Sequence, residues 1–416
     1  MKPIPVMIPY FTQEEKDAVS QVLDSGWVAQ GPKVVEFEKA VAAHEGVRYG
    51  IATTSCTTAL HLALIALGAK EGMDVIAPSF TFVATVNAIK MTGAEPVLVD
   101  VLQDTYNIDP DGIAELLESK YVKEGSQYVN RSNGNVLWGI VAVHQFGLCA
   151  DMPRINRIAS EHGLRVLEDA ACAIGAKIGD IHQGGFGNVS CLSFHPRKSI
   201  STGEGGMALT DDEELAKRMR TLRSHGASVS ADQRHAGRGF LLPEFNEVGY
   251  NYRMTDIQAA IGLAQVGKLD WMLAERSRRA DLYTQLILGH VPFLIPPVVP
   301  SGYTHSYQSY VCLLDPKALG IEGIERCGEF RNELLAALEE QGIATRQGTH
   351  AVHLLGYYRE NYGYKPEDLP AAYACDRLSI TLPLYVQMTD EDQARVVDAV
   401  KISAANILRI LKDGRR

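Results

Sequence analysis

Apolar residues recur along the first seventy positions with the spacing of helices. Thr12 and Glu15 form a capping box, in which a hydroxyl at the helix start and an acid three residues later each accept a hydrogen bond from the other's backbone N–H. The apolar stripe that follows predicts a helix with one buried face. A second amphipathic helix is expected over about 33–45. Residues 57–69 are almost wholly apolar, which predicts a helix buried on all sides.

Short, continuous apolar runs then alternate with segments of helical period. The runs are too uniformly apolar for strands with one wet face, so they suit a mostly parallel sheet covered on both sides. They lie at 74–78, 96–101, 136–143, 164–168, 189–194 and 206–210. Segments of helical period lie at 82–92, 110–119, 151–162 and 212–222. This alternation predicts an α/β fold of layered helices and sheet.

The pattern changes after about residue 226. Residues 226–250 are polar and Gly-rich without a period, which predicts a long functional loop. A capping box at Thr255 opens a helix to about 268. Beyond it we expect a charged helix at 270–288, proline-rich turns at 292–300, a strand at 306–314, and helices at 325–341 and 390–411. Since single cores stop growing near about 250–300 residues, we predict two domains, 1–265 and 266–416.

Composition and charge exclude several classes of protein. Hydrophobic residues make up 46% and charged residues 22% of the chain, which is ordinary globular composition. The formal net charge of −10 argues against binding to nucleic acid or to a membrane surface. No apolar run approaches the roughly 18 residues of a membrane-spanning helix, and residues 1–10 lack the core of a signal peptide. We therefore expect a cytoplasmic protein.

The seven cysteines are scattered and odd in number, and no two of them form a C-x-x-C pair. This arrangement argues against a disulfide framework, a zinc ribbon or an iron–sulfur cluster. We expect reduced thiols and no metal.

The strongest local signal is the run SFHPRKSISTGEGG, residues 193–206, between two predicted core strands. Lys198 stands in it among small hydroxyl residues and glycines. Burial at a strand end disfavours the ammonium form, so this lysine is disposed to lose its proton. A neutral amine can bond covalently to a carbonyl compound. A solvated loop lysine is an equally good explanation of the motif alone.

Two acids close the predicted strand 164–168. On a strand Glu168 and Asp169 point to opposite faces, and one of them can reach a ligand at the carboxyl edge of the sheet. Such a carboxylate suits a protonated pyridine nitrogen. Taken alone, the pair is better explained as acids at a helix start, where they complement the helix dipole.

Two further signals lie near the predicted buried helix. Hydroxyl residues at 53–58 lead into that helix, and free N–H groups at a helix start bind phosphate, although simple N-capping is commoner. Phe82 follows a strand and could cover a planar cofactor, although most such aromatics belong to the core. No Walker A motif is present and no G-x-G-x-x-G follows a strand, so nucleotide hydrolysis and a Rossmann site lack support.

Several long motifs, in family order, identify a resemblance. From about residue 8 to about residue 397 the chain resembles the DegT/DnrJ/EryC1/StrS sugar aminotransferases, which are pyridoxal phosphate (PLP) enzymes of fold type I with the aspartate aminotransferase fold. The motifs are SGWVAQGPKVVEFE (25–38), TSCTTALHLAL (54–64), APSFTFVATVNAI (77–89), VHQFGLCADM (143–152), EDAACAIGA (168–176), SFHPRKSISTGEGG (193–206) and GYNYRMTDIQAAIGLAQ (249–265). The resemblance implies a large mostly parallel sheet domain and a smaller C-terminal α+β domain.

The resemblance implies roles for residues that match the family's motifs. Lys198 matches the lysine that binds the cofactor covalently, Asp169 the acid facing the pyridine nitrogen, and Phe82 the aromatic stacked on the ring. The implied phosphate-binding residues are Thr57, Thr58 and Ser193.

Other matches concern the substrate and a second subunit. Asn251 matches a residue that reaches the phosphate in the partner subunit, which implies a homodimer with shared active sites. The implied substrate residues are Trp27, His195, Arg253, which could also share the role of Asn251, and His353.

The chain departs from the family pattern at two cysteines. Position 56 is usually glycine, so Cys56 implies a differently shaped loop. Position 172 is usually a polar residue near the PLP 3-hydroxyl, and the thiol of Cys172 is a poor hydrogen-bond donor. We expect specificity to differ at about 119–135 and at 226–246.

The resemblance further implies the reaction. An amino group would pass from L-glutamate to a keto sugar of the nucleotide-linked 4-keto-6-deoxyhexose type, in surface polysaccharide biosynthesis. The nucleotide, the position aminated and a non-nucleotide acceptor such as a keto-inositol stay open. Two alternative hypotheses are a PLP-dependent sugar dehydratase and a non-catalytic sugar-sensing regulator on the same fold. The presence of Lys198 and the scattered cysteines argue against the first, and the intact Lys–Asp pair against the second.

Overall fold

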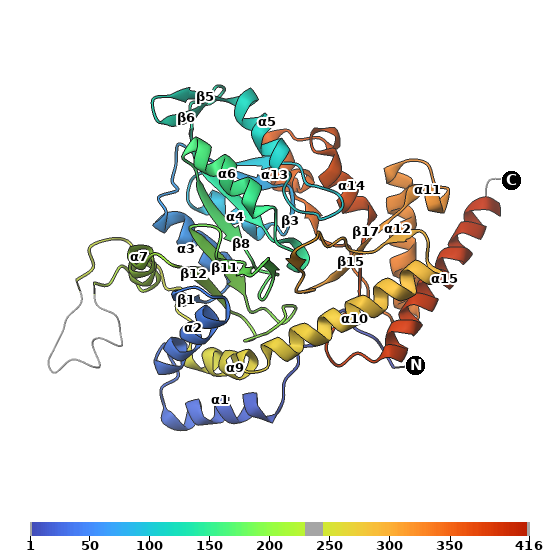
Figure 1. Ribbon diagram of the computed structural model, residues 1–416, viewed down its shortest axis with the longest axis horizontal. Coiled ribbons are helices and arrows are strands. Elements are labelled where there is room, and N and C mark those ends of the chain that lie inside the picture. Colours follow the sequence, from blue (N-terminus) through green and yellow to red (C-terminus); the bar gives the residue numbers. More distant parts are fainter. Residues whose placement is uncertain (1, 229–243, 414–416) are drawn as a thin grey trace.

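A nine-stranded mixed sheet forms the centre of the fold (Figure 1). The computed structural model describes residues 2–228 and 244–413. The main path of the sheet has the order β1-β12-β11-β8-β7-β2-β4, and a hairpin of β5 and β6 joins it through β7. The strands are β1 Tyr49–Thr53, β2 Met73–Pro78, β4 Glu95–Val99, β5 Tyr121–Glu124, β6 Gln127–Asn130, β7 Val136–Val143, β8 Arg165–Asp169, β11 Val189–Ser193 and β12 Gly206–Thr210.

Strand directions decide which ends share an edge. Strands β11, β8, β7, β2 and β4 are mutually parallel, which confirms the mostly parallel sheet. Strand β12 is antiparallel to both β11 and β1, so β1 runs in the same direction as the parallel set. The carboxyl ends of β1, β2, β7, β8 and β11 therefore lie along one edge.

Helices cover both faces of this sheet, as the continuous apolar runs predict. In β2, Val75 and Ala77 belong to the apolar cluster formed with α3 and α4, whereas Ile76 packs in the cluster formed with α5 and α6. The helices of this part are α1 Gln13–Ser25, α2 Pro32–His44, α3 Cys56–Ala66, α4 Ala84–Met91, α5 Pro110–Lys120, α6 Met152–His162, α7 Glu213–Arg223 and α9 Asp256–Val266. Each lies on a segment predicted to be helical.

A smaller antiparallel sheet lies to the right in Figure 1, among the C-terminal helices. Its strands are β13 Leu294–Ile295, β15 Tyr310–Leu314 and β17 Ser379–Leu382. The helices are α10 Leu269–His290, α11 Pro316–Leu319, α12 Ile324–Glu340, α13 Gly356–Tyr362, α14 Pro370–Leu378 and α15 Asp390–Asp413. One apolar cluster contains residues of both α3 and β15, so packing does not mark the division at 265, which stays a prediction.

Short elements complete the described chain. Strands β9 Lys177–Ile178, β10 Ile181–His182 and β14 Tyr303–Thr304 form one small sheet, and β3 Phe80–Thr81 pairs with β16 His350–Ala351. Three 3-10 turns are η1 Gln145–Gly147, η2 Val352–Leu354 and η3 Pro366–Asp368. The segment 119–135 holds the β5–β6 hairpin, which projects at the top of Figure 1. Of the predicted loop 226–250, residues 229–243 lie outside the described residues.

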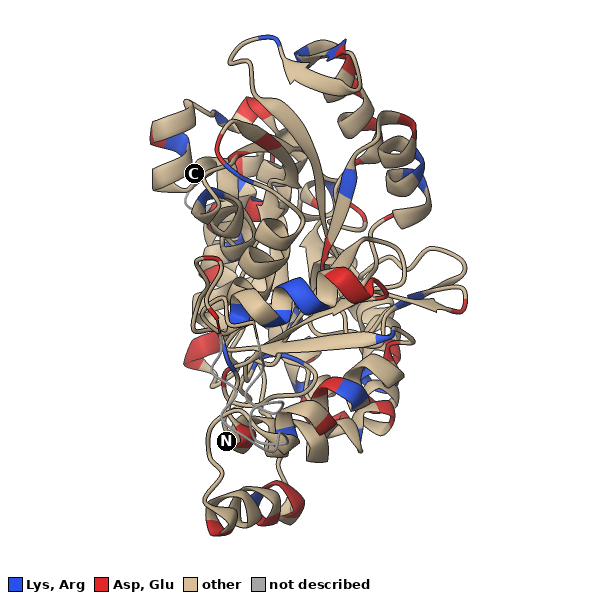
Figure 2. Cartoon of the chain, turned by 90° about the vertical axis from the view of Figure 1, so that its left-hand side faces the viewer, with Lys and Arg blue, Asp and Glu red and all other residues tan. Residues whose placement is uncertain are grey.

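The described residues have charges of both signs on their helices and no helix suited to a membrane. In Figure 2, acidic and basic residues are interspersed along the helices that face the viewer. Within residues 2–228 and 244–413, no helix combines the length and the apolar character needed to cross a membrane.

The first helix is tied to α9 through a buried acid, and this tie predicts a pH effect. Glu15 accepts hydrogen bonds from Gln265 at 2.7 Å and from Lys268. Burial raises the pKa of Glu15, but the bonds from Lys268, Thr12 and Gln265 outweigh it and lower the pKa to about 2. The stabilisation is therefore complete above the ordinary value of 4.5 and is lost as pH falls toward about 2. We expect Glu15→Gln to reduce the loss of thermal stability across this window, measured by circular dichroism. A wild-type loss across that window undiminished in Glu15→Gln would contradict this prediction.

Candidate active site

The predicted functional residues gather where the parallel strands end. Asp169 is the last residue of β8, Ser193 is the last residue of β11, and α3 begins just after β1. Because these strand ends share one edge, side chains from positions far apart in sequence meet there.

Asp169 is buried at this edge and is held by two donors. The Thr85 hydroxyl donates to Asp169 Oδ2 at 2.7 Å, and the Ala171 N–H donates to Oδ1 at 3.1 Å. Burial raises the pKa of the Asp169 carboxyl, and the opposing effects of Thr85, Ala171 and Lys198 do not cancel it. A ligand that brings a positively charged N–H group to this carboxylate would therefore stabilise its ionised form.

Lys198 lies in the turn between β11 and β12, within reach of the same acid. Its Nζ donates to Cys172 Sγ at 3.1 Å. Burial lowers the pKa of Lys198, but Cys172, Cys56 and Asp169 together raise it above its usual value. Burial thus favours the neutral amine, as the sequence predicts, but the groups that surround Nζ, which sequence alone did not show, act in the opposite direction.

The start of α3 forms a capped helix end at the same edge. Ser55 Oγ accepts from the Thr58 N–H at 3.2 Å, and Thr58 Oγ1 accepts from the Ser55 N–H at 3.0 Å. A Cβ at Gly206 would lie 2.3 Å from the Ser55 carbonyl carbon, so glycine is required for β12 to pass this close. Thr57 is half-buried on the first turn, where backbone N–H groups have no acceptor within the helix.

Both unusual cysteines are accommodated without disturbing the site. Cys56 is the first residue of α3, and its buried thiol donates to the Cys191 carbonyl at 3.6 Å. It lacks the positive φ that would favour glycine, so the helix start is regular. The thiol of Cys172 acts as an acceptor for Lys198 rather than as a donor.

Phe82 precedes α4 and is 64% exposed, although it lies in the turn that holds Asp169. Its carbonyl accepts from the Thr85 N–H at 3.2 Å, and Thr85 in turn bonds the Asp169 carboxylate. An aromatic ring this exposed, one turn before the residue that bonds Asp169, is accessible to a planar ligand.

The predicted substrate residues are dispersed around this centre. Trp27 donates from Nε1 to the Gln30 carbonyl at 3.2 Å, and His195 Nδ1 accepts from the Arg197 N–H at 3.2 Å. Arg253 donates to Ser224 Oγ at 3.2 Å, while Asn251 is exposed beside it.

His353 lies in the interior, away from solvent. Its Nδ1 is 2.6 Å from Ser79 Oγ, just after the end of β2. Its substrate role stays a prediction, because in the described chain the ring tethers the β2–β3 connection and has no exposed surface.

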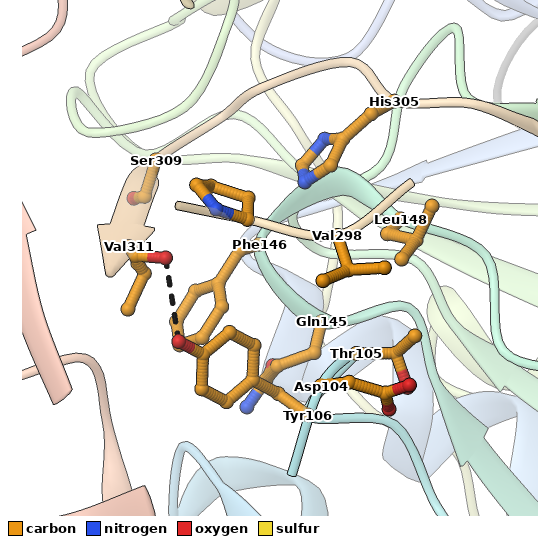
Figure 3. Close-up of a pocket in the computed structure, with 11 residues that line it drawn as sticks. Asp104, Thr105, Tyr106, Gln145, Phe146, Leu148, Val298, His305, Ser309 and Val311 are labelled. Atoms are coloured by element: carbon orange, nitrogen blue, oxygen red, sulfur yellow. Dashed lines mark hydrogen bonds between the residues drawn. The ribbon is translucent and has the colours of Figure 1, made fainter. Parts of the chain in front are cut away.

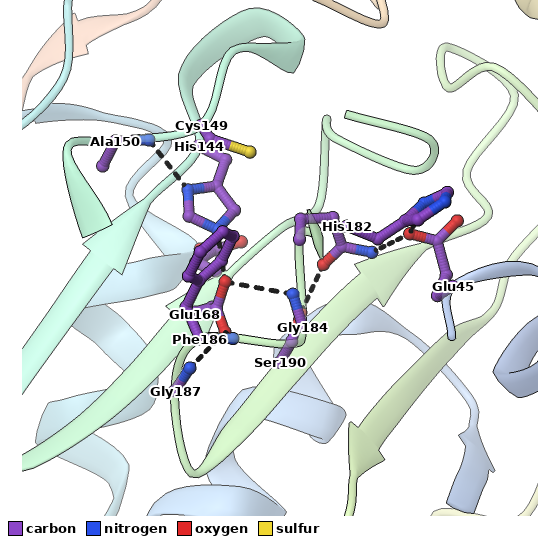
Figure 4. A network of polar contacts seen from close by, with 12 residues as sticks. Glu45, His144, Cys149, Ala150, Glu168, His182, Gly184, Phe186, Gly187 and Ser190 are labelled. Atoms are coloured by element: carbon purple, nitrogen blue, oxygen red, sulfur yellow. Dashed lines mark hydrogen bonds and ion pairs between the residues drawn. The ribbon is translucent and has the colours of Figure 1, made fainter. Parts of the chain in front are cut away.

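Sequence analysis did not identify the support of Asp169. The neighbouring Glu168 points the other way, as strand alternation predicts, and accepts from His144 Nε2 at 2.8 Å (Figure 4). It also accepts from the N–H groups of Gly184 at 3.0 Å and Gly187 at 2.6 Å. His144 Nδ1 accepts from the Ala150 N–H at 3.1 Å, so Nε2 carries the proton given to Glu168. The acid thus fixes the loop and strand that carry Asp169, instead of capping a helix.

This support predicts a large stability effect. In Glu168→Gln one oxygen becomes an NH₂ group facing backbone donors, which leaves buried groups unsatisfied at a cost of about 3 kcal/mol. We expect a lower thermal midpoint by circular dichroism, whereas Glu161→Gln, on the exposed face of α6, should change nothing. Equal midpoints for the two variants would show that the carboxylate is not needed.

A small pocket elsewhere in the structure is lined by none of the predicted site residues. It is lined by Asp104, Thr105, Tyr106, Gln145, Phe146, Leu148, Pro297, Val298, His305, Ser309 and Val311, and Tyr106 closes one side by donating to the Val311 carbonyl (Figure 3).

Residues 9–401 match the model of the DegT/DnrJ/EryC1/StrS aminotransferase family. The chain belongs to this family. Spore coat polysaccharide biosynthesis protein SpsC of Bacillus subtilis is 38% identical over 399 residues, which cover 96% of each chain. The PLP form of Spr1654 of Streptococcus pneumoniae, a putative sugar aminotransferase, matches with TM-score 0.84 and 26% identity over 97% of this chain and 99% of that one. DesI in the presence of its TDP-sugar product matches with TM-score 0.83 and 27% identity over 100% and 96%.

This aminotransferase is accordingly a PLP-dependent enzyme of sugar biosynthesis with the fold type I architecture. Its residues fit the chemistry of the cofactor: a buried carboxylate, an exposed aromatic ring, a capped helix start and a buried lysine amine are all present in this part of the sheet edge. These comparisons do not support the alternative hypotheses of a sugar dehydratase or a sugar-sensing regulator.

Proposed function

We propose that this aminotransferase transfers the amino group of L-glutamate to a nucleotide-linked keto sugar, of the 4-keto-6-deoxyhexose class, for a surface polysaccharide. The observation that carries the proposal is the hydrogen-bonded Lys198 beside the buried Asp169 at the edge where the strands end. The name of SpsC supports a polysaccharide pathway, and the TDP-sugar product of DesI supports a nucleotide-linked acceptor.

Each residue has a proposed task. PLP, when bound, supplies a ring that accepts the electron pair left by a broken C–H bond. Lys198 holds the cofactor and, once released by the amino donor, carries the proton from one carbon to the other. Asp169 holds a proton on the ring nitrogen, and its two fixed donors orient the carboxylate for this task. Phe82 covers one face of the ring.

The phosphate is assigned to the start of α3. Thr57, Thr58 and Ser193 offer hydroxyls near backbone N–H groups that have no acceptor within the helix. Cys172, whose thiol already contacts Lys198, replaces the polar residue expected near the ring hydroxyl.

A homodimer in the cytoplasm is part of the proposal. Asn251 is exposed, and nearby Phe245 and Val248 are 62% and 86% exposed, as suits a face covered by a second copy. Arg253 lies on the same segment. All seven cysteines are free, which suits a reducing compartment.

The test is an assay of L-glutamate with a panel of keto sugars carried on UDP, GDP or dTDP. We expect 2-oxoglutarate to form in equal amount with an amino sugar, identified by mass spectrometry. A dehydratase would give a deoxygenated sugar without 2-oxoglutarate, and a regulator would bind sugar without turnover. Either outcome would overturn the proposal. Light scattering that gives the mass of one chain would overturn the dimer.

A further inference from the structure

A cluster of metal-ligating side chains lies outside the active site. His44 and Glu45 stand at the end of α2, and His182 stands on β10 of the small β9–β10 hairpin. Each of these three residues offers one ligand atom, and the three ligand atoms all lie within 4.8 Å of one another. His44 Nδ1 is 2.7 Å from Glu45 Oε1, and His182 Nδ1 is 3.5 Å from Glu45 Oε2. Figure 4 shows His182 and Glu45 side by side.

One ring nitrogen of the histidine on the hairpin has no hydrogen bond. His182 Nδ1 is buried and has no hydrogen bond, although it points at the carboxylate from a distance longer than a good bond. Buried ring nitrogens are normally satisfied, so an unpaired one beside a carboxylate needs an explanation. A cation between the two groups would supply it.

The other two ligands are already oriented by outer partners. His44 Nε2 lies 3.0 Å from Asp270 Oδ1, which orients the ring, and a metal bound by Nδ1 would replace the present 2.7 Å contact of Nδ1 with Glu45 Oε1. Glu45 is buried, and its oxygens accept from Gln183 Nε2 at 2.6 Å and from the Gly175 N–H at 3.1 Å. Carboxylate–histidine pairs and hydrogen-bonded carboxylates of this kind surround most zinc sites.

We propose that His44 Nδ1, Glu45 and His182 Nδ1 bind one Zn²⁺ ion, with water as the fourth ligand. Two imidazoles and a carboxylate suit zinc, and bonds of about 2.0–2.1 Å in a tetrahedron separate ligand atoms by about 3.4 Å. The observed separations bracket that value, so small side-chain rotations complete the site. The ion would join the end of α2 to the β9–β10 hairpin, and Asp270 would link the site to α10. The lack of a Cys pair, on which the sequence prediction of no metal rested, does not bear on this site.

The alternative is a metal-free ion pair between a protonated His44 and the two acids. The titration is done at two pH values, because zinc releases protons from its histidine ligands whereas an ion pair does not bind the metal. This alternative leaves His182 Nδ1 without a hydrogen bond and predicts no dependence on zinc.

The experiment titrates untagged, chelator-treated holoenzyme with Zn²⁺ by calorimetry, with the thermal midpoint as a second readout. We expect one ion per chain and a rise of the midpoint. His182→Gln should weaken binding at least 100-fold, and Asp270→Asn should weaken it about 10–100-fold. Two controls should bind as the wild type does: His162→Gln, whose ring bonds the Ile158 carbonyl within α6, and Cys172→Ser, which tests for a thiol site.

The outcomes separate cleanly. His182 is part of a small hairpin and is not fully buried, so its variant is expected to fold, as unchanged circular dichroism and cofactor absorbance would verify. No saturable binding to the wild type, or equal binding by a folded His182→Gln, would overturn the proposal. Loss of binding in Cys172→Ser alone would move the ion to the active site and overturn it as well.

Discussion

Replacing Lys198 with alanine should lower glutamate-dependent turnover by at least about 10³-fold, because a positioned general acid–base alone contributes about 10²–10⁴-fold. The variant also loses the amine that holds the cofactor, so the visible absorbance of the lysine-bound form should disappear. Steady-state formation of 2-oxoglutarate and an absorbance spectrum measure the two effects.

The matched control is Lys123→Ala, at an exposed position of the β5–β6 hairpin. It should retain wild-type turnover and colour. A Lys198→Ala enzyme that transaminates near the wild-type rate would show that another residue carries the proton.

Asp169→Asn should give the second largest loss, of about 10²-fold or more in turnover. The amide keeps the size of the side chain and one oxygen for the Thr85 hydroxyl, but it cannot hold a proton on the ring nitrogen by charge. The absorbance spectrum of the bound cofactor and its pH dependence should change as well, which a purely structural defect would not cause.

Asp180→Asn, in the exposed β9–β10 turn, serves as the control and should behave as the wild type. If Asp169→Asn kept both its turnover and its spectrum, the buried carboxylate would have no part in the reaction. Asp169→Glu should recover part of the activity, because the charge is retained in a displaced position.

The elements of the fold were largely readable from local patterns. The capping box at Thr12 and the uniformly apolar β7 are signals complete within a short segment, and both predicted elements are present. Strand β1, YGIAT, was missed because its glycine and alanines give a weak apolar signal, and β17 was missed because it has only four residues. The antiparallel direction of β12 depends on the turn that carries Lys198, which local patterns do not determine.

The chemistry of the site was only partly readable. Asp169 and Lys198 stand in motifs, so their positions could be predicted, but the contact of Lys198 Nζ with Cys172 Sγ at 3.1 Å joins residues 26 positions apart and forms only on folding. The contact of Glu168 with His144 likewise joins two strands. For the same reason no spacing rule could pair His44 with His182, which fold together across 138 positions of the chain.

The central claim is that Lys198 carries the cofactor, and borohydride treatment followed by peptide mass spectrometry tests it directly. Reduction makes the link between lysine and cofactor permanent. The account predicts a phosphopyridoxyl group on the peptide that contains Lys198, and on no other peptide. A label on a different lysine, or no label on protein that has taken up the cofactor, would contradict it.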